Sequence, residues 1–277
     1  MSPLWRDHLL ISLAPDELSW VRLSGVLKPE ARDKCVVTIE NPHGARSWDN
    51  AVSALREETV KWRDDRLLVS IVLSNHFVRY ALIPHSQGIN GYKEELALAK
   101  FHFSKVHGET VRDWDIRLSP AYSGGARLAC AIDTALIETL RQLFPQNRRQ
   151  RLASVQPLLM SAFNSGASGI PEAGAWLLIV EHDRTCVALL SGKTWYAVQN
   201  VKGQFLGSEA WVSLVERERW RVNLDSVPDT ILVLSPGTPS LPHQSHGAWK
   251  MSEMQLRWPV GMQPARDSIY AKAISAA

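Results

Sequence analysis

Residues 67–84 read LLVSIVLSNHFVRYALIP, a stretch in which one strand pattern closely follows another. Leu67–Leu73 is a nearly continuous apolar run of strand length, which is typical of a central strand covered on both faces. Residues 74–76 break this run with polar side chains, and residues 77–83 then resume a strand pattern that ends at Pro84. The stretch therefore predicts a buried strand and a second strand, separated by a short polar loop.

The residues before this stretch predict three further strands and a helix. Residues 14–17, Ala-Pro-Asp-Glu, are a turn signal between the first two strands. Apolar side chains recur at three- and four-residue spacing in the helical segment. The predicted elements are strands at 8–13, 18–23 and 35–39 and a helix at 48–62. Together with Leu67–Leu73, they give an antiparallel three-strand meander, a crossover helix and a further strand.

The residues after this stretch alternate between helix and strand patterns. A helix is predicted from about residue 93 to 107, and strands at 111–118 and 127–132. Asp133 or Thr134 caps a helix that runs to Phe144, where Pro145 ends it. A short strand at 152–155 follows, and Pro157 opens another helical turn.

The second half of the chain repeats the order of the first. Glycine and proline in residues 164–174 mark a boundary. Beyond it, the predicted elements are strands at 175–180, 185–190 and 194–201, a helix at 208–221 and a final buried strand at Thr230–Leu234. Residues 235–247 read as a Pro/His-rich surface loop, and we expect the last dozen residues to be a loosely held tail.

This repetition predicts an α/β fold with two lobes. Each lobe is a mixed sheet, a three-strand meander plus a crossover strand, with flanking helices. We place the first lobe at residues 1–165, with an inserted subdomain at about 76–120, and the second lobe at 166–277.

Composition narrows the functional class. The chain has 277 residues, of which 45% are hydrophobic and 21% charged, as in soluble globular proteins. Its 31 basic and 28 acidic side chains nearly cancel, which excludes a strongly electrostatic nucleic-acid binder. Cys35, Cys130 and Cys186 form no CxxC pair, so neither a disulfide scaffold nor a cysteine-built zinc site is expected. No segment resembles a bilayer span or an export signal, which predicts a cytoplasmic protein without direct membrane insertion.

Eleven tryptophans are the unusual count in this composition. They are scattered without a repeat period, and tryptophan is a large apolar residue with one hydrogen-bond donor. We expect most of them to pack at contacts between domains and subdomains, and the remainder to be ligand platforms or partner anchors.

Catalytic and metal-binding motifs are missing from the sequence. Residues 191–194, Ser-Gly-Lys-Thr, end like a phosphate-binding loop, but Val187 stands where that loop needs glycine, so a hairpin turn is favoured. His243 and His246 have metal-like spacing without a nearby carboxylate or cysteine to complete the set. Because catalytic residues assemble in space, this does not exclude an enzyme.

The order of elements resembles the actin-like, ribonuclease H-like fold, which sugar kinases share. The match is sharpest in residues 67–84 and 127–157, which include RLACAIDTALIETLRQLF and the strand RLASVQP. These passages look like PilM and its relatives: the actin-like cytoplasmic proteins of type IV pilus biogenesis, the MshI-type pilus proteins and the cytoplasmic part of the GspL secretion component. The resemblance covers most of residues 8–235.

Two turns depart from the nucleotide-binding members of this fold, which carry glycine-bearing phosphate hairpins. The first turn, at residues 12–17, has no glycine, and Pro15 removes a backbone donor. The second turn, at residues 181–184, also lacks glycine. Carboxylates in both turns repel phosphate. We therefore expect a degenerate ATP site, no cofactor and no catalysis.

The resemblance implies a non-catalytic adaptor of an inner-membrane type IV pilus or type II secretion-like assembly. It would be cytoplasmic, and peripheral to the membrane through its partner, the cytoplasmic tail of a membrane-spanning protein. We expect that tail to bind a groove of the inserted subdomain, with Phe77, Arg79 and Tyr80 as contacts. The alternative for these residues is ordinary strand alternation, with Arg79 facing water. The sequence does not decide between a monomer and a homodimer.

Three other functions remain open at this stage. An ATP-binding PilM-type protein keeps the fold with an altered loop. A small-molecule kinase of the sugar-kinase class requires a catalytic aspartate in the cleft, whereas residues 74–76, after Leu73, contain no carboxylate. An unrelated soluble α/β protein is the third alternative.

Overall fold

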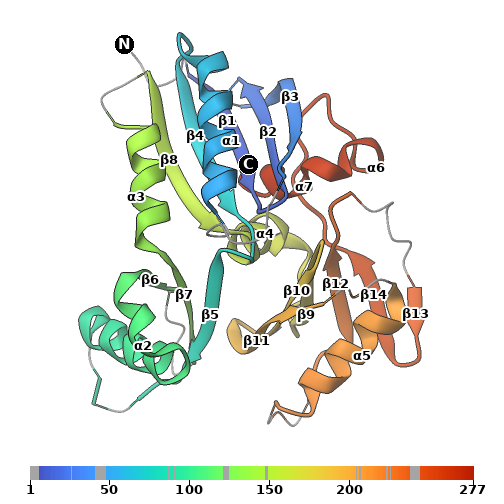
Figure 1. Ribbon diagram of the computed structural model, residues 1–277. Coiled ribbons are helices and arrows are strands. Elements are labelled where there is room, and N and C mark those ends of the chain that lie inside the picture. The colour runs from blue at the N-terminus through green and yellow to red at the C-terminus, as the bar shows by residue number, and fades with distance from the viewer. Residues whose placement is uncertain are drawn as a thin grey trace.

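Three β-sheets organise the computed structural model (Figure 1). It describes residues 6–25, 27–40, 48–86, 88–89, 91–120, 125–146, 149–203, 205, 207–222, 224, 226–237 and 244–277. No helix among these residues is long and apolar enough to cross a membrane.

The first sheet has the strand order β3-β2-β1-β4-β8. Its strands are β1 (Asp7–Leu13), β2 (Glu17–Ser24), β3 (Glu30–Thr38), β4 (Leu67–Leu73) and β8 (Gln150–Pro157). Strand β1 pairs antiparallel with β2 and parallel with β4, and β4 pairs parallel with β8. The predicted meander and crossover strand are therefore present, and β3 begins five residues earlier than the predicted residue 35.

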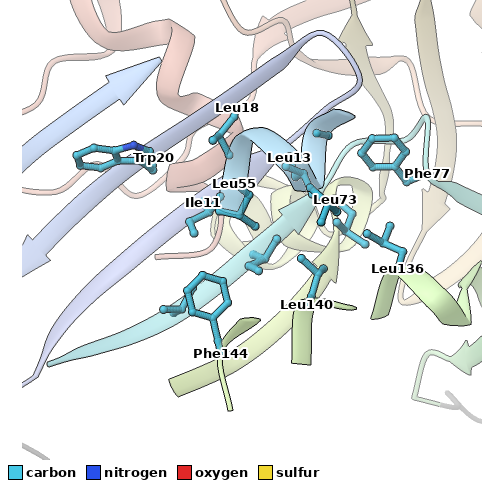
Figure 2. Packing of buried hydrophobic residues seen from close by; sticks show 14 of the residues in the cluster. Ile11, Leu13, Leu18, Trp20, Leu55, Leu73, Phe77, Leu136, Leu140 and Phe144 are labelled. Carbon is cyan, nitrogen blue, oxygen red and sulfur yellow. The ribbon is translucent and has the colours of Figure 1, made fainter. Parts of the chain in front are cut away.

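Both faces of the first sheet are covered, which explains the nearly continuous apolar run in β4. Helices α1 (Asp49–Thr59) and α3 (Thr134–Leu143) pack on one face, where Leu55 and Leu140 meet Ile11 (Figure 2). A single 3₁₀ turn, η2 (Val60–Trp62), extends α1. On the other face, Leu10 contacts Ile274 of the C-terminal helix α7 (Ala271–Ile274).

The second sheet repeats this order as β11-β10-β9-β12-β14-β13. Its strands are β9 (Ala175–Glu181), β10 (Arg184–Ser191), β11 (Thr194–Lys202), β12 (Thr230–Leu234), β13 (Gln244–His246) and β14 (Trp249–Glu253). Helix α5 (Ser208–Arg219) covers one face, and α4 (Leu158–Gly166) covers the other. Since α4 directly follows β8 of the first sheet, it joins the two lobes.

The third sheet, with order β5-β7-β6, belongs to the inserted segment. It comprises β5 (Val78–Ile83), β6 (Trp114–Leu118) and β7 (Arg127–Asp133). Helix α2 (Tyr92–His107) packs on it through Ala99 and Phe103, and the 3₁₀ helix η3 (Gly108–Asp113) leads into β6. The small sheet thus extends beyond residue 120 to include β7.

Three sequence predictions for the C-terminal region are wrong. Thr230–Leu234 is not the final strand, because β14 pairs parallel with it. The predicted loop 235–247 contains strand β13, and its residues 238–243 lie outside the described residues.

The last dozen residues are not a loose tail. Alpha helix α6 (Pro264–Asp267) and the turn η5 (Ser268–Tyr270) lead into α7, where Ala273 and Ile274 are fully buried. Ser275 also donates a hydrogen bond to Ser161 of α4 at 2.8 Å. The apolar face of the first sheet stabilises this conformation, because Ala273 and Ile274 pack against it together with Met262.

Candidate functional site

The polar loop between β4 and β5 lies where the two lobes meet. The backbone N–H of Ser74 donates to the carbonyl of Leu13, so the loop leaves β4 beside the end of β1. Ser74 and Asn75 are fully buried. Buried polar groups need hydrogen-bond partners, and here the partners come mainly from the second lobe.

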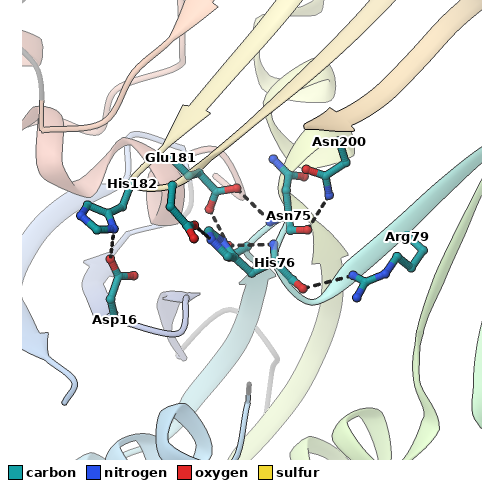
Figure 3. Close-up of polar contacts among 9 residues, drawn as sticks. Asp16, Asn75, His76, Arg79, Glu181, His182 and Asn200 are labelled. Carbon is teal, nitrogen blue, oxygen red and sulfur yellow. Dashed lines mark hydrogen bonds and ion pairs between the residues drawn. The ribbon is translucent and has the colours of Figure 1, made fainter. Parts of the chain in front are cut away.

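Glu181, at the end of β9, binds this loop across the lobe boundary (Figure 3). One carboxylate oxygen accepts a hydrogen bond from the Ser74 hydroxyl at 2.5 Å, and the other accepts from the backbone N–H of Asn75 at 2.9 Å. Asn200 of β11 donates to the Asn75 carbonyl oxygen at 2.6 Å. Two strands of the second sheet therefore hold a loop of the first.

His76 makes a second link, to Asp183 in the β9–β10 turn, through its Nε2 atom. Its Nδ1 atom lies 2.8 Å from the Ser74 hydroxyl oxygen. The hydrogen bond from His76 lowers the pKa of Asp183, so this carboxyl group stays ionised. Because Ser74 gives its own hydrogen to Glu181, its hydroxyl oxygen is left to accept, and it accepts from the backbone N–H of His76 at 3.2 Å.

The two turns in place of phosphate hairpins face each other across the same boundary. His182 Nδ1 lies 3.8 Å from an Asp16 carboxylate oxygen (Figure 3). Lys272 of α7 pairs with Glu17 at 2.9 Å. We call the contacts of residues 74–76 with Glu181 and Asp183, together with the Asp16–His182 pair, the interlobe clasp.

A cavity of about 350 Å³ remains beside the clasp. Asp16, Glu17 and Glu181 contribute carboxylates to its lining, against Lys272 and two histidines. The turn at residues 14–17 closes through one backbone hydrogen bond, from the Ala14 N–H to the Glu17 carbonyl at 2.9 Å. Such a lining is poorly suited to a triphosphate, because its three carboxylates outnumber its one lysine, which already pairs with Glu17, and a triphosphate needs converging backbone N–H groups. Among the described residues, no group of three histidine, cysteine or acidic side chains is placed to hold a metal ion.

The architecture of two repeated sheets with an inserted small sheet has known structural counterparts. The cytoplasmic domain of EpsL, an inner-membrane component of the type II secretion system of Vibrio cholerae, matches with a TM-score of 0.57 and 14% identity, covering 98% of this chain and 96% of that chain. A Bacteroides thetaiotaomicron protein described as having an actin-like ATPase fold and unknown function matches with a TM-score of 0.56 and 11% identity, covering 87% and 86%. This chain has the actin-like ATPase fold.

A third similar structure is the PilM–PilN type IV pilus biogenesis complex. It matches with a TM-score of 0.55 and 14% identity, and covers 82% of this chain and 80% of that chain. No protein-family model matches the sequence, and no curated protein matches it. The actin-like fold predicted from the sequence is thus confirmed.

The three predicted contact residues have different environments. Phe77 is 6% exposed and belongs to the core of the first lobe. Tyr80 packs between the cores of the two lobes, its hydroxyl donates to Asn75 Oδ1 at 2.8 Å, and burial raises its pKa well above the usual value. Only Arg79, of these three, has an exposed side chain. The structure therefore separates them into one surface residue and two packing residues.

Arg79 and Phe77 nevertheless line a cavity of about 730 Å³ between the inserted segment and the first lobe. Its remaining lining residues are Trp48, His76, Thr110, Arg112, Asp113, Trp114, Ala131, Asp133, Thr134 and Ala135. Burial and the nearby Arg184 lower the pKa of Arg79, whose guanidinium group still remains cationic at neutral pH. His76 lines this cavity and also the interlobe cavity.

Sequence reasoning missed His76, Asn200 and Lys272 as members of the interlobe contact. The polar break at residues 74–76 within an apolar stretch was the one available signal for His76. Lys272 was assigned to a loose tail, and Asn200 lies in the ordinary alternation of β11. Nothing local distinguishes these two, because their partners come from distant segments.

Proposed function

We propose that this protein is a non-catalytic adaptor on the cytoplasmic side of an inner-membrane assembly of the type IV pilus or type II secretion kind. The observation that carries the proposal is the interlobe clasp. The carboxylate of Glu181, in the second glycine-free turn, is hydrogen-bonded to Ser74 and Asn75 and is not open to a phosphate group. The adjoining cavity is lined by three carboxylates, which would repel one. The fold shared with EpsL and PilM supports the assignment to such an assembly.

Calorimetric titration with Mg-ATP tests the absence of nucleotide chemistry. We expect no heat of binding at micromolar concentrations of protein. We also expect no release of inorganic phosphate from ATP in a separate hydrolysis assay. A matched variant, Asp16→Asn with Glu181→Gln, removes two charges from the turns and should still not bind, because the glycine-free backbone is unchanged. Micromolar binding by the unmodified chain would establish the ATP-binding alternative instead.

The partner in this proposal is the cytoplasmic tail of a membrane-spanning protein, bound in the cavity lined by Phe77 and Arg79. Arg79 offers an exposed guanidinium beside apolar walls, which suits a segment with an acidic side chain next to an apolar one. Tyr80 does not contact the tail in this proposal. Its hydroxyl group donates to Asn75 and so stabilises the loop that forms one wall of the cavity.

Binding of synthetic tail peptides tests this part of the proposal. The peptides are the cytoplasmic tails of membrane-spanning proteins encoded beside this gene, and the readout is fluorescence anisotropy. We expect Arg79→Gln to weaken the binding of one tail about tenfold, the loss of one charge-assisted contact. Arg32→Gln, an exposed arginine of β3, is the matched control and should leave affinity unchanged. Equal affinity of both variants would place the tail elsewhere.

A further inference from the structure

Trp220, immediately after helix α5, is the exception among the tryptophans that the structure describes. Its side chain is 90% exposed, while the other nine are buried or half-buried. Tryptophan combines a large apolar ring with one polar N–H, so it is favoured at boundaries between water and an apolar phase. A solvent-exposed indole on an ordered helix end therefore requires an explanation other than the core packing of the other nine.

Arginines surround this indole in sequence, at positions 217, 219 and 221. Glu218, which is 1% exposed, anchors two of them. Arg217 donates to its carboxylate at 3.2 Å, and Arg221 does so at 3.2 Å. A guanidinium has five N–H donors, so both arginines retain donors that face solvent.

Arg219 is positioned differently, over the ring of Trp249 in β14, with the guanidinium carbon 5.6 Å from the ring centroid. Trp249 in turn donates to Glu216 at 3.1 Å. The helix end is consequently fixed against the second sheet. Ordering these side chains beforehand reduces the entropy lost when they bind something else.

We propose that this helix end, formed by Arg217, Arg219, Trp220 and Arg221, binds the anionic phospholipid headgroups of a membrane surface. Guanidinium groups bind phosphate through paired hydrogen bonds, and the indole has the chemistry of the headgroup region. Among the exposed large apolar side chains of the described residues, Trp220 is the one with an arginine directly before and directly after it in the sequence. Tyr92 has one arginine, Arg127, over its ring, and Phe101 has one lysine, Lys105, over its ring.

The contact is weak by itself. Each arginine near an anionic surface contributes about a fivefold increase in partitioning. One buried glutamate offsets part of this charge. The lipid contact of this helix end thus functions as a second attachment, which orients a protein that its partner already holds at the membrane. This role goes beyond partner capture and does not depend on whether the protein binds nucleotide.

Vesicle sedimentation of the full chain tests the proposal. Vesicles of phosphatidylcholine with an equal share of phosphatidylglycerol are compared with phosphatidylcholine alone, at low salt and at about 0.15 M salt. We expect binding to the anionic vesicles, a decrease with salt, and about a fivefold loss in Arg221→Gln. Trp220→Ala should also bind the anionic vesicles several-fold more weakly than the unmodified chain does.

Two matched variants control for general effects. Arg112→Gln removes an exposed arginine that likewise pairs with a glutamate three residues earlier, and Phe101→Ala removes an exposed aromatic ring beside a lysine. Both should bind vesicles as the unmodified chain does. Trp220 is exposed, so unchanged thermal unfolding is expected for Trp220→Ala. Arg217 still pairs with Glu218 when Arg221 is replaced, so at most a small decrease is expected for Arg221→Gln. Failure of the unmodified chain to bind anionic vesicles, or equal losses in the control variants, would overturn the proposal.

Discussion

Glu181 contributes more to the lobe contact than its position at a strand end indicates. It satisfies two buried donors of the opposite lobe, the Ser74 hydroxyl and the Asn75 N–H. Hydrogen bonds to an ionised acceptor are stronger than neutral ones, and an unpaired buried donor is costly. One carboxylate thus adds to the loop's own hydrogen bonds, which run from the His76 and Phe77 N–H groups to Ser74.

We predict that Glu181→Gln lowers the free energy of unfolding by about 1–3 kcal/mol, because a neutral amide accepts these bonds less strongly and brings an unpaired N–H group. Urea unfolding followed by circular dichroism measures the change. Glu172→Gln, an exposed glutamate of the linker before β9, should have no effect. An equal effect of the two substitutions would mean that Glu181 is a surface residue in solution.

His8 in β1 makes stability dependent on pH. Burial lowers its pKa below the ordinary value of 6.5, and its Nε2 atom lies 2.8 Å from the Ser70 hydroxyl. The unfolded chain therefore takes up a proton at a higher pH than the folded chain does. Stability due to neutral His8 is complete above pH 6.5 and falls as pH is lowered toward the folded pKa.

We predict that His8→Gln flattens this dependence, since glutamine keeps a hydrogen-bonding group and does not titrate. The measurement is the difference in unfolding free energy between the two proteins from pH 7.5 to pH 5 (about the range over which an ordinary histidine titrates). That difference should change with pH in favour of the variant at the acid end. A constant difference contradicts a buried neutral His8.

At the level of elements, the C-terminal helix α7 is part of the first lobe. It fills the second face of β1 and β2, where Leu10, Val21 and Leu23 contact Ala273 and Ile274. Short length and the absence of a long apolar period made this segment unreadable as a helix from sequence. Only the sheet face opposite α1 and α3 determines that it folds there.

We predict that Ile274→Ala destabilises the protein by about 2–5 kcal/mol, the usual cost of a cavity in a packed core. Val260→Ala, whose side chain is 55% exposed, is the nearby control and should cost far less. Thermal and urea unfolding distinguish the two. A small effect of Ile274→Ala would restore the interpretation of these residues as a loose tail.

The elements that were correctly predicted are those whose signal is local. Leu67–Leu73 is apolar except for Ser70 because α1, α3 and α7 cover most of both faces of its sheet. By contrast, the contact between Ser74 and Glu181 joins residues 107 positions apart, and neither residue type indicates its partner. The glycine-free turns were visible in the sequence, whereas the bonds that connect them to residues 74–76 depend on the folded arrangement of both lobes.

At the scale of the whole molecule, the interlobe clasp fixes the angle between two lobes that otherwise share α4 and a boundary core. We predict one narrow inter-lobe distance in the unmodified protein and a broad distribution in Asp183→Asn with Glu181→Gln. Ser53 and Ser213 are exposed positions on α1 and α5, and each is replaced by a spin-labelled cysteine in a Cys35→Ser background. Pulsed electron paramagnetic resonance then measures the distribution of distances between the two labels.

The same labels with Glu172→Gln in place of the clasp substitutions provide the control, and should retain the narrow distribution. A broad distribution in the unmodified chain would show that the lobes move freely despite the clasp. A narrow distribution in the double variant would assign the orientation of the lobes to α4 and the boundary core.

The ion pair between Lys34 of β3 and Asp267 of α6 joins residues 233 positions apart. During synthesis on a ribosome, strands β1 to β3 emerge long before α6 and α7 exist. The apolar face of the first sheet that α7 covers therefore stays exposed until residues 264–274 have been synthesised. A break in translation before α6 would consequently expose the oldest part of the polypeptide rather than the newest, and make it a target for chaperones or proteases.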